Sequence, residues 1–304
     1  MTHRIDPPRR QPSRPRAAVP AGACDCHAHV FAAEGVYAYA PQRPYTPAEN
    51  TGLAAYRAML ERVGVGRAVL VHSNIYGPDN RATTDALALM AGAFRGIALI
   101  RRDIDDGELD ALAAAGMRGI RLNLEFPGGM TLDDVAAMGS RLAELGWHLQ
   151  ILVKAARLPA LSRRLLALPL DLVIDHMGLP VAAEGLAGVA PLLPLLETGK
   201  VWVKLSAPYY VTSQPLRGAP QPEPDAAPDH RIATATAQHL FAARPDRMLW
   251  GSNWPHPHSA PVPDEGELVD WIATVARTEA GLRQVLVDNP ATLYGFEVRA
   301  PQRP

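Results

Sequence analysis

The sequence has little cysteine, almost no net charge and no long apolar run, and each shortage excludes a class of protein. It holds two cysteines among 304 residues, Cys24 and Cys26, which lie two apart in one predicted strand. Cysteines so placed cannot form a bridge without distorting the strand, so we expect no disulfide framework and a reducing, cytoplasmic location. A formal net charge of −1 offers no basic surface for nucleic acid or an anionic membrane. No apolar run reaches the ~20 residues that a membrane helix needs.

The remaining composition is that of a globular protein with a large core, since 48% of the residues are hydrophobic and 20% are charged. Residues 1–20 carry five arginines and five prolines but no apolar stretch of the kind found in secretory signals. They are predicted to form a disordered tail, with a transit peptide as the alternative. Residues 21–296 are predicted to form one domain, and residues 297–304 a C-terminal tail.

Short β-rich runs alternate with stretches of helical periodicity along the predicted domain. The predicted strands span 23–31, 67–73, 96–100, 119–124, 148–153, 172–175, 201–206 and 247–252. The predicted helices span 53–63, 81–93, 108–115, 132–145, 158–168, 187–198, 230–243 and 265–287, with a final turn over 290–294. Eight strands in such alternation predict parallel βαβ units closed into a (β/α)8 TIM barrel. A doubly wound open sheet is the alternative, which the lack of a glycine-rich loop after the first strand disfavours.

Polar side chains gather where the predicted strands end, which is the face on which such barrels build their active sites. In strand order they are His27 and His29, His72 and Ser73, Arg121 and Asn123, Lys154, His176, Lys204 and Ser206, and Asn253 and His256. Two insertions, 35–50 and 214–229, follow the first and seventh strands and are expected on the same face. The pattern therefore predicts an active site at the carboxyl ends of the strands, with loops that can cover it.

His27 and His29 lie two residues apart at the end of the first predicted strand, so their side chains project to the same side. Two converging imidazoles can hold a metal ion or polarise a bound carbonyl. A chance pair on a solvated strand is the alternative, because short motifs are only hypotheses.

Arg121 is expected to point into the mouth of the barrel, because Ile120 and Leu122 share the opposite face of the fourth strand. A guanidinium in that place suits recognition of a carboxylate. An ion pair buried inside the barrel is the alternative.

Six short motifs occur at these strand ends and in the first insertion. They are DCHAHVF from Asp25, YTP from Tyr45, RGIRLN from Arg118, IDHMG from Ile174, KLS from Lys204 and WGSNWPH from Trp250. Together they resemble the amidohydrolase superfamily, and most closely its lactonase branch, which includes 2-pyrone-4,6-dicarboxylate lactonase, sulfomuconolactone hydrolase and sugar-acid lactonases. The resemblance extends over residues 21–296.

The resemblance implies a barrel hydrolase that opens a lactone ring by attack of water. The family's carbonyl-binding roles would fall on His27, His29 and His176, and its proton-accepting Asp on position 253. Tyr45, Ser73 and Arg121 match positions expected to touch the substrate. Asn123, Lys154 and Tyr210 are further candidates for substrate binding.

The chain departs from the family pattern at Asn253, where an Asp is usual. A carboxylate can accept a proton, whereas a neutral amide only donates or accepts hydrogen bonds. Another group among His256, His176 and His29 then acts as the base, and His256 is our leading candidate. Alternatively the protein needs no base there or only binds its ligand, or the amide is an engineered replacement. A second departure is the segment around Tyr210, which offers no arginine for a second carboxylate.

We expect that no cofactor is required. Three neutral histidines, His27, His29 and His176, could hold one Zn²⁺ or Mn²⁺ as the alternative, although the fifth strand offers no convincing ligand. The predicted function is hydrolysis of a small, carboxylated lactone. A metal-dependent decarboxylase or hydratase of aromatic acids on the same fold and a non-catalytic small-molecule binder are the alternatives. The only partner expected is the small lactone or carboxylic acid itself.

Overall fold

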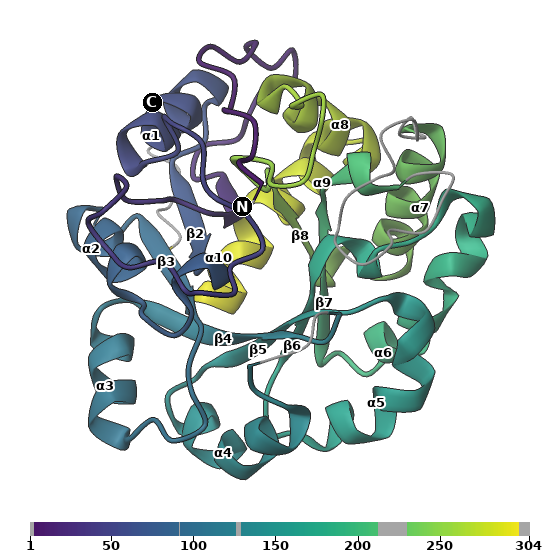
Figure 1. Cartoon of the computed structure of the whole chain (residues 1–304). Coiled ribbons are helices and arrows are strands. Elements are labelled where there is room, and N and C mark those ends of the chain that lie inside the picture. The colour runs from purple at the N-terminus through teal and green to yellow at the C-terminus, as the bar shows by residue number, and fades with distance from the viewer. Residues whose placement is uncertain (1–2, 91, 126–128, 212–229, 298–304) are drawn as a thin grey trace.

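The computed structural model describes residues 3–90, 92–125, 129–211 and 230–297, and its eight parallel strands form one ring-shaped sheet (Figure 1). The strands are β1 (Cys24–Ala28), β2 (Arg67–Val71), β3 (Phe94–Ala98), β4 (Met117–Asn123), β5 (His148–Leu152), β6 (Leu172–Ile174), β7 (Val201–Ser206) and β8 (Met248–Gly251). Each strand pairs in parallel with the next along the chain. Most of the helices surround the ring, whereas the C-terminal helix of residues Asn289–Tyr294, drawn in yellow, lies across its centre in this view (Figure 1). The predicted (β/α)8 barrel is therefore confirmed.

The helices follow the predicted alternation with the strands. They are α1 (Leu53–Val63), α2 (Arg81–Leu89), α3 (Asp106–Ala114), α4 (Leu132–Glu144), α5 (Leu158–Ala167), α6 (Leu193–Glu197), α7 (His230–Ala243), α8 (Glu265–Ala276), α9 (Glu279–Arg283) and α10 (Asn289–Tyr294). α3 and α4 begin at capping boxes, in which Asp105 and Thr131 accept the backbone N–H three residues on. Such caps satisfy donors that a helix start leaves without an intrahelical partner.

Two predicted helices are broken in the structure. The stretch 187–198 was predicted as one helix, but a 3₁₀ segment (Ala182–Leu192) with Pro191 inside it precedes the short α6. The stretch 265–287 divides because Arg277 takes a left-handed φ of 63° and ends α8. A left-handed residue is a common end of an α-helix, and local periodicity does not reveal it.

β1 contains a bulge that turns both pairs of its motif residues into the barrel. Its pairing with β2 gains one residue on β1 between Asp25 and Ala28. Such a bulge re-aims the side chains that follow it. The two cysteines pack in the lower core with Tyr294 of α10, with their Sγ atoms 3.8 Å apart and unbonded. The two histidines of the motif project into the barrel above them.

The barrel closes between β8 and β1 through residues of the motifs DCHAHVF, from Asp25, and WGSNWPH, from Trp250. The backbone N–H of Asn253 donates to the carbonyl of His27 at 2.8 Å. The N–H of His29 donates to the carbonyl of Trp254, also at 2.8 Å. Closure of the sheet and placement of the candidate site therefore depend on the same short segments.

The N-terminal segment, for which composition predicts a disordered tail, contacts carboxylates at the start of α8 and within it. Ser13 donates through its backbone N–H and its hydroxyl to Asp264, at 3.0 and 2.8 Å. The backbone N–H groups of Arg16 and Ala17 donate to Asp270 at 2.8 and 2.9 Å. These carboxylates lie more than 250 positions further along the chain than the groups that donate to them. The composition and local pattern of residues 1–20 therefore give no sign of the contacts.

Within the described ranges, no helix combines the length and the apolar character that crossing a membrane requires. The predicted insertion 214–229 and the C-terminal tail from residue 298 onward lie outside the described residues.

Replacement of Gly251 by alanine is expected to destabilise the closing seam. A Cβ added at Gly251 would lie 2.5 Å from the Cβ of His27. Because overpacking a core costs about 1–3 kcal/mol, the free energy of unfolding, measured with urea, should fall by that amount. Gly66 provides the control, since a Cβ there meets nothing within 4 Å, and G66A should stay within ~0.5 kcal/mol of the wild type. A G251A protein as stable as G66A would contradict the close approach.

Candidate active site

A cavity of about 340 Å³ is formed by residues that follow the carboxyl ends of the strands. The predicted site residues that line it are His29, Tyr45, Ser73, Arg121, Asn123, His176, Tyr210 and Asn253. Gln42, Pro44, Asn74, Leu152, Leu179, Pro257 and His258 complete the lining. The structure thus brings most of the predicted residues together, from strands that are far apart in the sequence. His27, Lys154 and His256 were predicted with them but do not line this cavity.

A buried carboxylate, Asp175, lies beneath the cavity. One oxygen, Oδ1, is 3.6 Å from Nζ of Lys204 and 3.3 Å from Nδ1 of His27. The other, Oδ2, is 3.5 Å from a terminal nitrogen of Arg121 and accepts a hydrogen bond from Gln150 at 3.0 Å. Asp175 and Lys204 are fully buried, so two cations share one carboxylate in a region without bulk water.

Charge compensation sets the ionisation of this cluster. Burial alone would raise the pKa of Asp175, yet its contacts with His27, Lys204 and Arg121 hold that pKa well below its usual range. Burial lowers the pKa of Lys204, and the Asp175 charge opposes that effect. We therefore treat Asp175 as ionised, because a carboxylate between two cations loses more by protonation than it gains.

His29 is neutral and presents a lone pair to the cavity. Its Nδ1 lies 2.8 Å from the carbonyl oxygen of Val71, which can only accept, so Nδ1 carries the proton. Burial, and then the charge of Arg121, lower the pKa of His29 to about 3. Nε2 is thus an acceptor at neutral pH.

His176 follows β6 in a left-handed conformation, with φ of 50°. Its Nδ1 lies 2.8 Å from Oγ of Ser206 on β7. Burial lowers the pKa of His176 to about 4. His27 lies below it, with ring centroids 4.6 Å apart, and the Nε2 of His27 has no hydrogen-bond partner within the described part of the chain.

Arg121 combines the two arrangements that the sequence left open, a guanidinium that faces the cavity and a buried ion pair. It lines the cavity, as predicted from strand alternation, and it also pairs with Asp175. Its side chain is only 9% exposed. The hydroxyls of Tyr45 and Ser73, which also line the cavity, lie 3.1 Å apart, so the insertion after β1 is tied to the end of β2.

Asn123 and Lys154 lie at different depths. Asn123 lines the cavity, and its Oδ1 accepts the backbone N–H of Glu125 at 3.0 Å. Lys154 lies outside the cavity, with Nζ 3.8 Å from a carboxylate oxygen of Glu125. The structure therefore places Lys154 against an acidic neighbour rather than beside the cavity.

Asn253 is 1% exposed and forms part of the cavity wall. Its amide nitrogen donates to the hydroxyl of Tyr209 at 2.9 Å and to the hydroxyl of Tyr210 at 3.2 Å. Its φ of 62° is left-handed, a region in which Asn and Asp are enriched among non-glycine residues.

His256, the predicted base, lies behind this wall. Its Nδ1 is 3.1 Å from the hydroxyl of Tyr209, and its Nε2 is 2.9 Å from Oε1 of the fully buried Glu265. Both ring nitrogens are therefore engaged by protein groups, and Tyr209 and Asn253 lie between His256 and the cavity.

His27, His176 and Asp175 form the group of side chains that could hold a metal ion, with one ligand atom from each within 4.8 Å of the others. The sequence predicted His29 as the third ligand, but the structure groups Asp175 in its place. The residue directly before His176 was the available signal, and it was read only as part of a motif.

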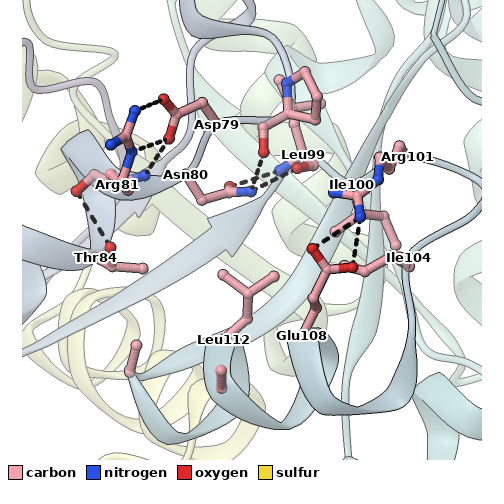
Figure 2. A pocket seen from close by; sticks show the side chains of 13 residues that line it. Asp79, Asn80, Arg81, Thr84, Leu99, Ile100, Arg101, Ile104, Glu108 and Leu112 are labelled. Carbon is pink, nitrogen blue, oxygen red and sulfur yellow. Dashed lines mark hydrogen bonds and ion pairs between the residues drawn. The ribbon is translucent and has the colours of Figure 1, made fainter. Parts of the chain in front are cut away.

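An outer cavity of about 460 Å³ lies between α2 and α3, away from these groups. Its charged side chains pair with one another, Arg81 with Asp79 and Arg101 with Glu108 (Figure 2). The lining contains no histidine and no cysteine. We therefore take the inner cavity as the candidate active site.

Sequence reasoning placed Lys204 at a strand end but gave it no role, and it did not single out Asp175, Gln150, Tyr209 or Glu265, which support the residues that line the cavity. A charged residue inside an apolar strand, such as Lys204 in β7, was a signal for buried partners, since burial of a charge requires them. The two loop residues Gln42 and His258 carried no comparable signal.

Comparisons with known proteins agree with this geometry. A family model described as Amidohydrolase matches residues 24–296. A 2-pyrone-4,6-dicarboxylate hydrolase of Comamonas testosteroni is 37% identical, over 93% of this chain and 93% of that protein. A 4-sulfomuconolactone hydrolase of Rhizobium radiobacter is 32% identical, over 91% of each chain.

Two further matches extend the comparison. A D-galactarolactone isomerase of Agrobacterium fabrum is 27% identical, over 92% of this chain and 93% of that protein. A crystal structure from Pseudomonas putida, of a candidate 2-pyrone-4,6-dicarboxylic acid hydrolase, superposes with a TM-score of 0.77 at 34% identity, over 92% of this chain and all of that one.

The buried histidines predict a loss of stability on acidification. Burial lowers the pKa of His72 to about 4 and of His148 to about 3, as it does for His29 and His176. In the unfolded chain these groups return to about 6.5. Between pH 6.5 and 4 the unfolded state therefore binds more protons than the native state, so stability is complete above this window and falls as the pH falls through it.

Urea unfolding at a series of pH values measures this effect, which we expect to reach ~1.4 kcal/mol per pH unit for each such histidine. H72Q should reduce the slope of the unfolding free energy against pH by the contribution of about one proton. H230Q, at an exposed position at the start of α7, should leave it unchanged. Stability that is constant from pH 6.5 to 4 would contradict the buried neutral histidines.

Proposed function

The chain belongs to the amidohydrolase family, and on that premise we propose that it is a hydrolase that opens a small, carboxylated lactone by attack of water on the ring carbonyl. The observation that carries the proposal is Arg121, a guanidinium at the wall of a cavity that three neutral histidines, His29, His176 and His258, also line. Hydrolases of cyclic esters among its relatives, at 37 and 32% identity, support the reaction class.

Arg121 supplies the anchor for a carboxylate. Its Nε has no hydrogen-bond partner within the described part of the chain, although the side chain is nearly buried. A buried donor without a partner costs free energy that a ligand can recover. Arg121 is also the only lysine or arginine among the residues that line the cavity. We therefore propose a lactone with one carboxylate held there, rather than two matched clamps.

The neutral polar groups around the cavity would hold the rest of the ring. Tyr45, Ser73 and Asn123 line the cavity, and each can donate or accept a hydrogen bond. His176, neutral between Ser206 and the cavity, would contact the lactone carbonyl. As the water oxygen bonds to the carbonyl carbon, the charge that develops on the carbonyl oxygen is stabilised by the Arg121 guanidinium in a site with little water.

The proton of the attacking water needs an acceptor. We propose Nε2 of His29, because it is the lone pair that the Val71 contact leaves open at the cavity. The pKa of about 3 that burial and Arg121 impose on His29 makes it a weak base, and the developing negative charge would strengthen it. The ring C–O bond then breaks, and the released oxygen takes up the proton. His256 is not proposed as the base, since Tyr209 and Glu265 engage both of its nitrogens.

We propose that this reaction needs no metal ion, because the candidate ligand group does not fit one. Asp175, the anionic member, already faces Lys204 and Arg121. The charges of Asp175, Lys204 and Arg121 sum to +1. A divalent ion bound there would raise the sum to +3, without bulk water to screen it. The charge of Asp175, the anionic member of the group, is therefore already compensated by cations of the protein itself.

A panel of carboxylated pyrones, muconolactones and sugar-acid lactones tests the function by release of protons on ring opening. We expect turnover of at least one member, unchanged by a chelator and by added Zn²⁺. Turnover that appears only with added metal would favour the decarboxylase or hydratase alternative. Binding of panel members without turnover would favour a non-catalytic binder.

Replacing Arg121 by methionine is expected to raise KM for a carboxylated lactone by about 10- to 100-fold, since a hydrogen bond to a charged group contributes about 1.5–3 kcal/mol. Initial rates across substrate concentrations measure this change. R118M serves as the control, because Arg118 of the same strand bonds backbone carbonyls and does not line the cavity. Equal KM values for the two variants would remove Arg121 from substrate binding.

Asn253 favours a second candidate, isomerisation of a lactone by attack of the substrate's own hydroxyl. One relative, from Agrobacterium fabrum, is a D-galactarolactone isomerase. The hydroxyl oxygen bonds to the carbonyl carbon, the original ring C–O bond breaks, and the proton of the hydroxyl ends on the released oxygen. An intramolecular nucleophile reaches effective concentrations of about 10⁵–10⁸ M, which offsets the absence of a strong base.

Turnover in ¹⁸O-labelled water separates the two candidates. Hydrolysis places one ¹⁸O in the new carboxylate, whereas isomerisation leaves the product unlabelled and equal in mass to the substrate. Mass spectrometry of the products therefore distinguishes them. We expect label from a lactone without a free neighbouring hydroxyl, and product without label would eliminate hydrolysis for that substrate.

A further inference from the structure

We infer that Tyr209, Tyr210 and the buried pair of His256 and Glu265 fix the amide of Asn253 with its oxygen towards the cavity, as an acceptor for the attacking hydroxyl. The orientation follows from contacts of the free protein. Only the identity of the hydroxyl, from water or from the substrate, rests on the proposed function.

Tyr210 decides which end of the amide faces the tyrosines. Its hydroxyl donates its single proton to the carbonyl oxygen of Pro257 at 2.6 Å. That carbonyl has no proton of its own, so the Tyr210 oxygen can only accept from Asn253, 3.2 Å away. A flipped amide would set its oxygen against the lone pairs of Tyr210.

The direction in which the Tyr209 hydroxyl donates its proton follows from that assignment. Tyr209 accepts the second proton of the Asn253 amide at 2.9 Å, so its own proton goes to Nδ1 of His256, 3.1 Å away. The Nε2 of His256 then carries the imidazole proton and donates it to Glu265 at 2.9 Å. Every donor in this series of hydrogen bonds, from Asn253 through Tyr209 and His256 to Glu265, has an acceptor, and all four side chains are buried.

The backbone holds the other end of the side chain. The N–H of Asn253 donates to the carbonyl of His27 across the seam, and φ is left-handed at 62°. With both amide protons on the tyrosines, Oδ1 is the polar atom of Asn253 that is left for the cavity. Tyr209, His256 and Glu265 thus act as positioning residues, because they reach the reaction only through Asn253.

Nuclear magnetic resonance of the full-length protein with ¹⁵N-labelled asparagine tests the orientation without substrate. The side-chain signals of Asn253 are identified by their loss in N253D. We expect both amide protons to exchange with water at least 100-fold more slowly than those of exposed asparagines. In Y209F one of the two should lose this protection, whereas Y56F, which removes the hydroxyl of a buried tyrosine bonded to Asp25, should leave both unchanged.

Fast exchange of both protons in the wild type would overturn the inference, and so would a Y209F protein with both protons still protected. Neither result depends on a lactone being the substrate, so this failure is distinct from failure of the proposed function.

Substitutions at Glu265 test the positioning role in turnover of a lactone that the panel identifies. E265Q keeps an oxygen that can accept from His256, so it should retain at least half of the wild-type kcat. E265L lacks the acceptor and should lose about tenfold in kcat, with KM within about twofold of the wild type. Equal losses in both variants, or an effect confined to KM, would show that Glu265 has only a structural role.

Discussion

The ionised carboxylate of Asp175 is the interaction on which the rest of the site depends. It contacts side chains from four strands: His27 of β1, Arg121 of β4, Gln150 of β5 and Lys204 of β7. Burial of a lone charge is costly, so each of these cations and the carboxylate are tolerated in the barrel only because the others are there. The same contacts hold the ends of four strands at fixed separations, and that fixes the floor of the cavity.

This arrangement also determines what the cavity can bind. Lys204 and Arg121 together exceed the charge of Asp175 by one unit, and Arg121 is the cation that lines the cavity. Burial, and then the positive charge of Arg121, lower the pKa of nearby His29 to about 3 and keep it neutral. An anionic ligand, and the negative charge that develops on an attacked carbonyl, are then the species that the site stabilises. A metal ion would add to an excess that is already present.

Strand alternation and the count of β-rich runs were enough to predict the barrel and the position of Arg121, because both are local properties of a parallel sheet. The inward turn of β1 was not predictable, since its bulge is defined by pairing with β2. His256 was expected at the cavity because it follows β8, but the path of a loop depends on what it packs against. The contact with Glu265 draws His256 behind Asn253. The order of the N-terminal segment has the same origin, in partners supplied by α8 and its cap.

We interpret Asn253 as one member of a hydrogen-bond network in the cavity wall, which includes Tyr209 and Tyr210, rather than as the site of a missing carboxylate. The hydroxyl of Tyr210 is committed to Pro257, so a carboxylate at position 253 would face an oxygen that has no proton to offer. In this arrangement the hydroxyl of Tyr209 donates to Nδ1 of His256. Neither tyrosine hydroxyl therefore has a proton left to donate to a carboxylate at position 253. The neutral amide suits a reaction in which the nucleophile is positioned by hydrogen bonds and its proton leaves by another route, to His29 or to the departing oxygen of the ring.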